Sequence, residues 1–422
     1  MFIERSLFVL RRFLKKIHVI PENVARKELL KISTGKKVSN MSDFIFKITE
    51  NIVLGSYTLA RLGHYVKNYG SRFVVIMDPV LKEVNLQTKI LQPLIEQKIE
   101  YFIYDNITDG ANTKEIEQAL ILAQHGHVHG IIAVGGEKTL HIGAAVAALI
   151  NENQNIYDYM EGAVPTSGAI PLIAVPTTIR SPFIFGTNIP LVDSRSRQVK
   201  LLKSQNGLCK LVLWDPNLAL TLTDNQKSSI SLETLCIATE AFISQKASFF
   251  SDMFSEKSIE MMKLGLDGSK SLEVTNPAET LLTQAGCLAS IAAATSSIGI
   301  ATLLALTLNA RYKISRSLVT SILFPYIIED AKKYKADRIE RIAKTMGVTE
   351  EGQTADEAAS ALADNIRQRL AKANLPTRLK ELSLNVDQLA LVAEDAGQLD
   401  FMNSLARSMT SDELFDLLKL AY

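Results

Sequence analysis

Histidine is absent from most of this sequence. All six histidines of the 422-residue chain lie at or before His141, so about two thirds of the chain contains none. Imidazole is the commonest metal ligand among protein side chains and a frequent general acid or base. Any mechanism that requires an imidazole after His141 is therefore excluded.

Cysteine, net charge and long apolar runs are also scarce. The three cysteines, Cys209, Cys236 and Cys287, lie far apart and fit no metal-ligand spacing, so we interpret them as reduced core thiols of a cytoplasmic protein. The 46 basic and 45 acidic residues almost cancel, which argues against nucleic acid as a partner. No stretch of about 20 consecutive residues is apolar throughout, so we expect no membrane-spanning segment.

Residues 1–43 differ from the rest because they carry ten basic side chains and a net positive charge. Their apolar residues recur at heptad-like spacing, which predicts a helix that ends at Pro21, with a second short helix over about 22–33. The apolar seam consists of Ile3, Leu7, Leu10, Leu14 and Ile17. Two interpretations stay open: a helix that docks on a protein partner or a membrane surface, and an arm packed on its own domain or on a dimer mate.

From residue 44 to 217, strand-like and helix-like stretches alternate. This rhythm predicts an α/β domain with a mostly parallel sheet that is covered on both faces. The strand candidates are Phe73–Met77, Glu100–Tyr104, Gly130–Val134, Leu172–Val175 and Leu211–Trp214, and the helix candidates include Lys114–His125 and Leu140–Asn151.

Residues 218–422 contain almost no strand-like segment and are rich in Ala, Leu, Ser and Lys. Thr354 and Glu357 have the spacing of a capping box, and apolar residues follow at every fourth position as far as Leu370. We therefore expect an N-terminal extension (1–43), an α/β domain (44–217) and an all-helical domain (218–422). A cleft between the last two is the default ligand site.

A glycine turn follows the apolar strand at 130–134. Gly135 and Gly136 join that strand to the start of a helix, a geometry that directs backbone N–H groups and the helix dipole at an anion. A pair of glycines at such a turn also occurs for backbone geometry alone.

The order of several motifs resembles that of the iron-containing alcohol dehydrogenases, a superfamily that includes glycerol dehydrogenases. The resemblance covers about residues 44–422 and implies a Rossmann-like domain followed by a helical metal-binding domain. Its main landmarks are the acid after the strand at 73–77, IIAVGGEKTLHIGAAVA at 131–147, IPLIAVPTTIRSPF at 170–183, Trp214-Asp215-Pro216, the helix at 233–242 and the segment 312–325. The cofactor contacts that it implies are Asp78, Gly135, Gly136, Lys138, Thr177 and Thr178.

The same resemblance indicates a lost metal site. In this superfamily an Asp and three His hold a divalent metal, and the corresponding residues here are Glu233, Ile237, Thr302 and Arg316. Isoleucine has no donor atom, a threonine hydroxyl is a poor ligand for iron or zinc, and arginine is permanently positive. We therefore expect no metal, and we predict that Arg316 occupies the metal's place and pairs with Glu233.

The nucleotide motifs are altered as well. The third glycine of the phosphate motif is Glu137, and its Asp and Lys are His141 and Ala144. Glu137 would repel a pyrophosphate unless it turns away, is screened, or caps its own helix. In the second loop two glycines are replaced by Arg180, a candidate phosphate contact, and Pro182, which lacks an N–H.

Two further features have competing interpretations. Asp78 is either a ribose ligand or the cap of a turn before Pro79. His125, His127 and His129 suggest a metal site, but their place before the strand at 130–134 favours a solvated turn.

These observations predict a pseudoenzyme of the iron-containing alcohol dehydrogenase family that acts through assembly or partner binding. The alternative is an NAD(P)-dependent oxidoreductase that acts on an alcohol or carbonyl without a metal, with Arg316 as its electrophile. A third hypothesis is a nucleotide-sensing regulator. NAD(P) is thus a possible cofactor, and the resemblance implies a homodimer or a larger homo-oligomer.

Overall fold

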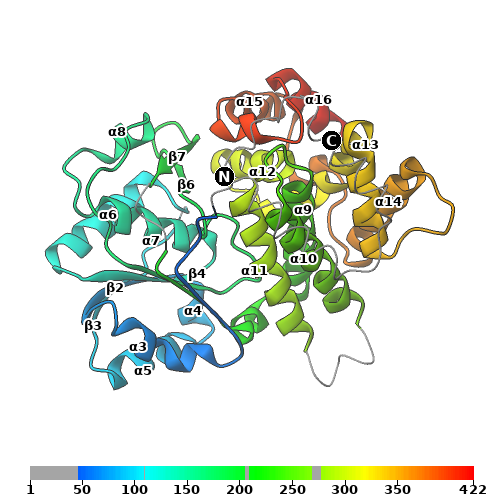
Figure 1. Cartoon of the computed structure of the whole chain (residues 1–422). Helices are drawn as coiled ribbons and strands as arrows, with labels where there is room; N and C mark the ends of the chain where they lie inside the picture. The colour runs from blue at the N-terminus through cyan, green and yellow to red at the C-terminus, as the bar shows by residue number, and fades with distance from the viewer. Residues whose placement is uncertain (1–45, 109, 205–208, 269–276) are drawn as a thin grey trace, which may run out of the picture. The chain divides into compact units, whose positions relative to one another are not determined.

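A six-stranded, fully parallel sheet lies at the centre of the N-terminal half of the computed structural model, which describes residues 46–108, 110–204, 209–268 and 277–422. The order of its strands is β1-β8-β5-β4-β2-β3 (Figure 1). The strands are β1 (Asn51–Leu54), β2 (Arg72–Met77), β3 (Glu100–Tyr104), β4 (Gly130–Gly135), β5 (Leu172–Pro176) and β8 (Leu211–Trp214). The predicted fold class is confirmed, and β3 and β8 have the predicted bounds.

Helices cover both faces of the sheet because its central strands are continuously apolar. The residues of β2 alternate between the two faces: Val74 and Ile76 pack in one cluster, and Phe73, Val75 and Met77 in another. The first face is covered by α6 (Thr113–His125) and α7 (Glu137–Leu149), and the second by η1 (Thr58–Arg61), α3 (Leu62–Val66) and α5 (Gln87–Glu96). The short helices α4 (Val80–Glu83) and α8 (Ile156–Met160) complete this half.

An antiparallel hairpin that we did not predict precedes β8. It consists of β6 (Asn188–Val192) and β7 (Val199–Lys203). Pro190 within the first strand and the charged residues Lys200 and Lys203 in the second hide the strand pattern in the sequence. The first strand of the hairpin packs beside α7.

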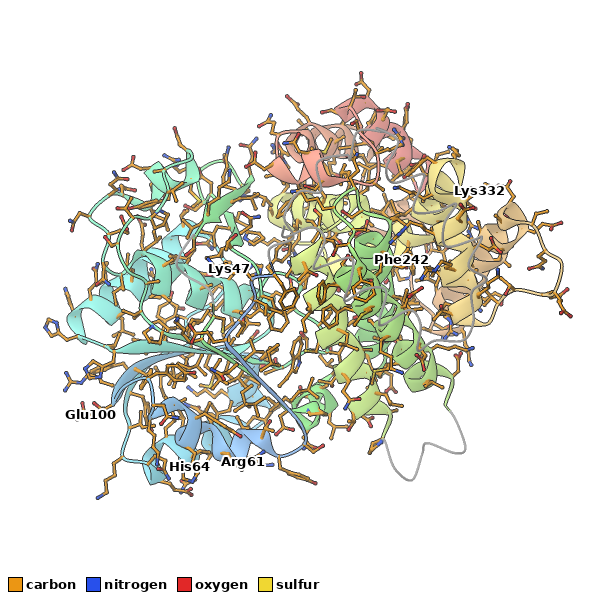
Figure 2. All side chains as sticks on the ribbon, viewed as in Figure 1. Lys47, Arg61, His64, Glu100, Phe242 and Lys332 are labelled. Atoms are coloured by element: carbon orange, nitrogen blue, oxygen red, sulfur yellow. The ribbon has the colours of Figure 1, made fainter. Side chains whose placement is uncertain are left out.

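After β8, the described chain is helical. The main helices are α9 (Asp224–Ile243), α10 (Phe249–Asp267), α11 (Ala278–Thr295), α12 (Ile300–Tyr312), α13 (Arg316–Met346), α14 (Ala355–Lys372), α15 (Val386–Gly397) and α16 (Ser411–Leu420), with 3-10 turns η2 (Pro216–Thr221), η3 (Leu379–Leu382) and η4 (Asp400–Ser404). Residues 229–243 of α9 are all buried, so this helix forms the axis of the helical half. Figure 2 shows its Phe242 among the surrounding helices, whereas Lys332 and Glu100 lie at the periphery.

Local signals explain where several helices begin. Thr354 and Glu357 form the predicted capping box at the start of α14, and Thr223 and Gln226 form another at the start of α9. Among the described helices, none is long and apolar enough to span a membrane alone; α11 and α12 reach that length only as a pair bent by 97°. The helices predicted within residues 1–43 lie outside the described residues.

Candidate functional site

The predicted cofactor residues meet at the carboxyl edge of the sheet. Chain order reverses between β2 and β4, since β3 flanks β2 on one side and β5 flanks β4 on the other. Open α/β sheets bind ligands at such a switch point. Asp78 follows β2, Gly135 ends β4 and Gly136 follows it, and Thr177 and Thr178 follow β5.

Most of these residues also have local structural roles. Asp78 accepts a hydrogen bond from the Val80 N–H at 3.3 Å, so it caps the turn after β2, and it lies 4.0 Å from Lys138 Nζ. The Thr178 hydroxyl donates to the Arg180 carbonyl at 2.9 Å. Gly136 is half-buried, and a Cβ built there would have Asp78 and Thr178 atoms no closer than 4.0 Å. The turn is therefore open at Gly136, whereas Gly135 is buried.

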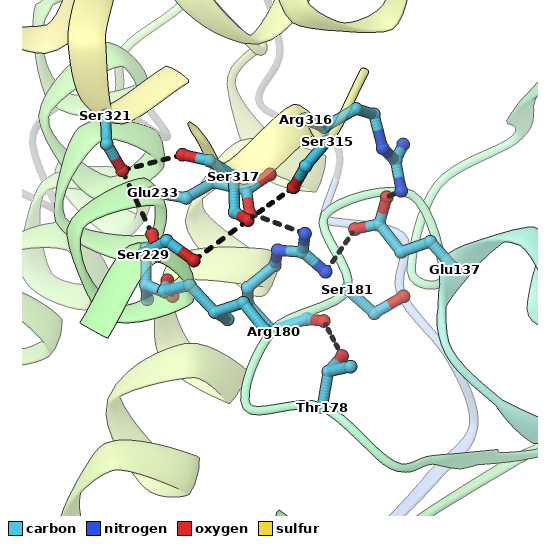
Figure 3. A network of polar contacts seen from close by, with 12 residues as sticks. Glu137, Thr178, Arg180, Ser181, Ser229, Glu233, Ser315, Arg316, Ser317 and Ser321 are labelled. Atoms are coloured by element: carbon cyan, nitrogen blue, oxygen red, sulfur yellow. Dashed lines mark hydrogen bonds and ion pairs between the residues drawn. The ribbon is translucent and has the colours of Figure 1, made fainter. Parts of the chain in front are cut away.

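Four charged residues join the glycine turn, the second loop and two helices, and we call them the ion quartet: Glu137, Arg180, Glu233 and Arg316 (Figure 3). Arg180 Nη2 donates to Glu233 Oε2 at 2.5 Å, and Arg180 Nη1 lies 3.4 Å from Glu137 Oε1. Glu137 also pairs with Arg316. The charges alternate along the chain of contacts, and none of the four side chains is more than 16% exposed.

The predicted direct pair between Glu233 and Arg316 is wrong. Arg180 lies between the carboxylates of Glu137 and Glu233 and donates a hydrogen bond to Glu233, while Arg316 pairs with Glu137. The reason is that the Glu137 side chain points into the interior from the first turn of α7, where it is 1% exposed. Of the three possibilities for Glu137, the inward direction of its side chain and the screening of its charge by Arg180 and Arg316 occur together.

Burial and charge set the protonation of the quartet. Burial by itself raises the pKa of Glu137, but the Arg180 and Arg316 guanidinium groups lower that pKa below its usual value. Burial raises the pKa of Glu233 even against the attraction of Arg180. The pKa of Arg180 is raised, because Glu137 and Glu233 outweigh the effect of burial. Glu233 is therefore the carboxylate that more readily takes up a proton.

A row of serine hydroxyls fixes α13 beside α9 (Figure 3). Ser317 Oγ lies 3.1 Å from Ser229 Oγ and 3.0 Å from Ser315 Oγ. The Ser321 hydroxyl donates to the Ser229 carbonyl at 3.1 Å. Because Arg316 stands within this row, its backbone is held at the edge of the quartet.

The second loop is packed into the interior. Residues 179–183 are all buried, and the Ser181 N–H donates to Ser290 Oγ on α11 at 2.9 Å. The Ile179 carbonyl lies so close to α11 that a Cβ at Gly286 would be 1.5 Å from its oxygen. The Trp214 indole N–H donates to the Thr178 carbonyl at 2.8 Å. These contacts direct Arg180 inward. Gly286 and Ser290 have no sequence pattern that singles them out in advance.

Glu240 is a further buried acid that sequence reasoning missed. Its carboxylate accepts hydrogen bonds from the backbone N–H groups of Gly299, Ala301 and Thr302 and from the Thr302 hydroxyl, the last at 2.7 Å. It thus caps α12 from another helix. Burial raises the pKa of Glu240 to about 7, although these hydrogen bonds oppose the rise.

The residues at the expected metal position do not fit a metal. Ile237 is a buried hydrocarbon in the helical core, and the Thr302 hydroxyl is engaged by Glu240. Glu233 is engaged by Arg180, and Arg316 is a cation. Across the ranges described, no group of three His, Cys, Asp or Glu residues is placed to hold a metal ion. The donor chemistry therefore disagrees with a divalent cation at this position.

The three closely spaced histidines lie where a solvated turn was predicted. His125, His127 and His129 are all exposed, and His129 Nδ1 accepts a hydrogen bond from the Ser71 N–H at 3.1 Å. They lie at the amino end of β4, opposite to the edge that carries the glycine turn.

Comparisons with known proteins identify the family of the chain. The chain matches the iron-containing alcohol dehydrogenase family over residues 49–216 and the C-terminal region of that family over residues 229–422. It is 21% identical to lactaldehyde reductase of Escherichia coli (strain K12) over 379 residues, which is 89% of this chain and 98% of that protein. It is 22% identical to an NADPH-dependent butanol dehydrogenase of Clostridium saccharobutylicum over 386 residues, 89% of this chain and 97% of that protein. A crystal structure of 1,3-propanediol oxidoreductase superposes with a TM-score of 0.84 at 20% identity, covering 90% of this chain and all of that one. The chain belongs to the iron-containing alcohol dehydrogenase family.

Proposed function

We propose that this chain is a non-catalytic member of its family, which lacks the divalent metal and acts by binding. The observation that supports this is the ion quartet, in which the protein's own guanidinium groups neutralise the carboxylates between its two halves. A guanidinium and a dication ~4 Å apart repel each other by about 8 kcal/mol at an effective dielectric constant of ~20. The two guanidinium groups of Arg180 and Arg316 already balance the carboxylates of Glu137 and Glu233, so no uncompensated negative charge is left to hold a dication.

Activity assays with full-length protein test this proposal. The protein is incubated with Fe²⁺ or Zn²⁺ and offered short-chain alcohols with NAD⁺ or NADP⁺, and the matching aldehydes with NADH or NADPH, with and without a chelator. We expect no turnover under any condition. Chelator-sensitive turnover overturns the proposal, and chelator-insensitive turnover that is lost in Arg316→Gln instead supports a metal-independent oxidoreductase.

Assembly is the second part of the proposal. We propose that the chain forms a homodimer or larger homo-oligomer and that residues 1–43 supply a contact with a partner protein or membrane surface, because that segment combines positive charge with an apolar seam. Light scattering of the full chain and of a chain lacking residues 1–43 separates the two roles. A monomeric full chain contradicts the assembly proposal.

A second candidate function is dinucleotide binding without turnover. It is favoured by the accessible backbone of Gly136 at the switch point, beside Asp78, Lys138 and Thr178. Gly136 has φ −75° and ψ −178°, which any residue adopts, so Gly136→Val is expected to fold and to block the approach. Gly168→Val, where the added Cβ also meets nothing within 4 Å, is the matched control.

Thermal shift with NADH and NADPH distinguishes the candidates. A ligand at 100 times its Kd adds about 2.7 kcal/mol to the free energy of unfolding. If the dinucleotide binds, we expect it to raise the melting temperature of the native chain and of Gly168→Val. We expect no such rise in Gly136→Val. No shift in the native chain rejects this second candidate.

A further inference from the structure

A cavity of about 300 Å³ lies where the start of β6 meets three segments of the helical half. These segments are the turn between α9 and α10, the turn between α11 and α12, and η4. At about 30 Å³ for each water-sized group, the cavity holds about ten non-hydrogen atoms. It is therefore sized for a molecule of about five carbons that also carries several oxygens.

Five polar side chains on the wall of this cavity have no partner in the protein. Thr187, Asn188, Lys246, Ser297 and Ser404 line it, and within the described part of the chain none of these side chains makes a hydrogen bond or an ion pair. Ser297 and Ser404 are only 6% and 3% exposed, yet each hydroxyl oxygen keeps some accessible surface. Buried polar groups are hydrogen-bonded as a rule. These side chains are therefore placed to bind water or a ligand in the cavity.

The same wall offers both hydrogen-bond donors and acceptors. The serine and threonine hydroxyls do both, the asparagine amide has an acceptor oxygen and two N–H donors, and the lysine ammonium only donates. Lys203 and Asp400, which form an ion pair, also line the cavity and add a carboxylate and a second ammonium. A ligand that only accepts, such as a carboxylate, or only donates, such as an amine, would leave part of this set without a partner. Hydroxyl groups complement the whole set, because each one both donates and accepts.

Two aromatic rings form part of the apolar wall. Phe183 and Phe401 line the cavity, with ring centres 6.0 Å apart and ring planes tilted by 51°. Pro182 and Ile298 line it as well and are buried. The C–H groups of a carbon chain or sugar ring lose their contact with water when they pack on such a surface. The cavity thus combines hydroxyl-binding groups with an apolar surface.

We propose that this cavity binds a five-carbon polyhydroxylated molecule, an aldopentose or a pentitol. Its hydroxyl groups exchange hydrogen bonds with Asn188, Ser297 and Ser404, and its C–H groups pack on the rings of Phe183 and Phe401. Binding of this ligand requires neither metal nor dinucleotide and no turnover. The inference and the function proposed above therefore fail on different measurements.

Calorimetric titration of the full-length protein with five-carbon probes tests the ligand class. Ribitol, xylitol and D-arabinitol are open chains, D-ribose and D-xylose form rings, and 1,5-pentanediol lacks the three middle hydroxyl groups of a pentitol. We expect at least one of the five polyhydroxylated probes to bind at millimolar concentration. We expect 1,5-pentanediol to bind at least about tenfold more weakly, because each lost hydrogen bond weakens binding by about fivefold. A preference for pentitols or for aldopentoses identifies the open-chain or the ring form. No binding of any of the five, or equal binding of 1,5-pentanediol, overturns the proposal.

Variants place the bound molecule in the cavity. Ser297→Ala and Ser404→Ala remove no hydrogen bond made by either side chain within the described part of the chain, so they are expected to fold and to weaken binding by about fivefold each. Gly186 lines the cavity, and a Cβ built there would meet only the Phe183 carbonyl oxygen, at 3.9 Å, so Gly186→Leu is expected to block binding. Gly168→Leu, where the added Cβ meets nothing within 4 Å, is the matched control and is expected to bind like the native chain. Native affinity in folded Gly186→Leu, or in both serine variants, overturns the proposal.

Discussion

Replacing Arg180 by methionine tests whether the ion quartet holds the interior together. The side chain is 7% exposed and contacts both Glu137 and Glu233. In Arg180→Met, Glu137 retains Arg316, but Glu233 loses its ion pair with Arg180. Removing one member of a buried ion pair costs about 3–5 kcal/mol.

The protonation of Glu233 gives an independent estimate of the same loss. Protonating a carboxylate of ordinary pKa about 4.3 at pH 7 costs about 3.7 kcal/mol, which limits the penalty for an unpaired Glu233. The folded variant then binds a proton that the unfolded chain releases, so its stability falls as the pH rises. At pH 5 the same protonation costs only about 1 kcal/mol. The deficit of Arg180→Met should therefore shrink from about 4 kcal/mol at pH 7 to about 1–2 kcal/mol at pH 5.

Urea unfolding followed by circular dichroism, with chelator present, measures this deficit. Arg72→Met is the control, since Arg72 and Glu100 form an exposed pair worth at most about 1 kcal/mol. Arg180→Met combined with Glu233→Leu removes both charges and should recover to within about 1–2 kcal/mol of the native chain. The reasoning is refuted if Arg180→Met is as stable as Arg72→Met at pH 7, or if the double variant is no more stable than the single one.

Three other predictions concern residues around the quartet. Gly286→Ala should destabilise the chain by at least about 3 kcal/mol in urea unfolding, because its Cβ would meet the Ile179 oxygen at 1.5 Å, and near-native stability contradicts that packing. Burial raises the pKa of Glu240 to about 7, so stability should fall by about 2 kcal/mol from pH 5 to 7 through this group, a fall that Glu240→Gln removes. Burial lowers the pKa of His141 to about 4, which has the opposite effect on stability. The contribution of His141 to the free energy of unfolding should rise by about 2 kcal/mol from pH 5 to 7, and it should be absent in His141→Leu. Parallel pH profiles for the native chain and either variant would reject the corresponding assignment.

The parallel sheet could be predicted because its strands are buried on both faces. Stretches such as Phe73–Met77 and Leu172–Val175 are continuously apolar and are separated by helix-like segments, and that pattern has few alternatives. The β6–β7 hairpin carries a proline and two lysines, so its pairing depends on tertiary packing that the sequence does not reveal.

The candidate site was only partly predictable. Residue type alone indicates that Ile237 and Thr302 are poor metal ligands. The pairing was mispredicted because the direction of the Arg180 side chain depends on contacts far away in the chain, such as the approach of Ile179 to Gly286. A signal was nevertheless present: Glu137 and Arg180 replace glycines of two adjacent loops with opposite charges. Considering those two positions together would have predicted their contact.

The metal content of the full-length protein tests the central claim most directly. The protein is equilibrated with Zn²⁺, or with Fe²⁺ under anaerobic conditions, desalted, and analysed for metal per chain by mass spectrometry. The ion quartet predicts far less than one ion per chain, unchanged in Glu233→Gln. One tightly held ion per chain that is lost in Glu233→Gln would contradict the account.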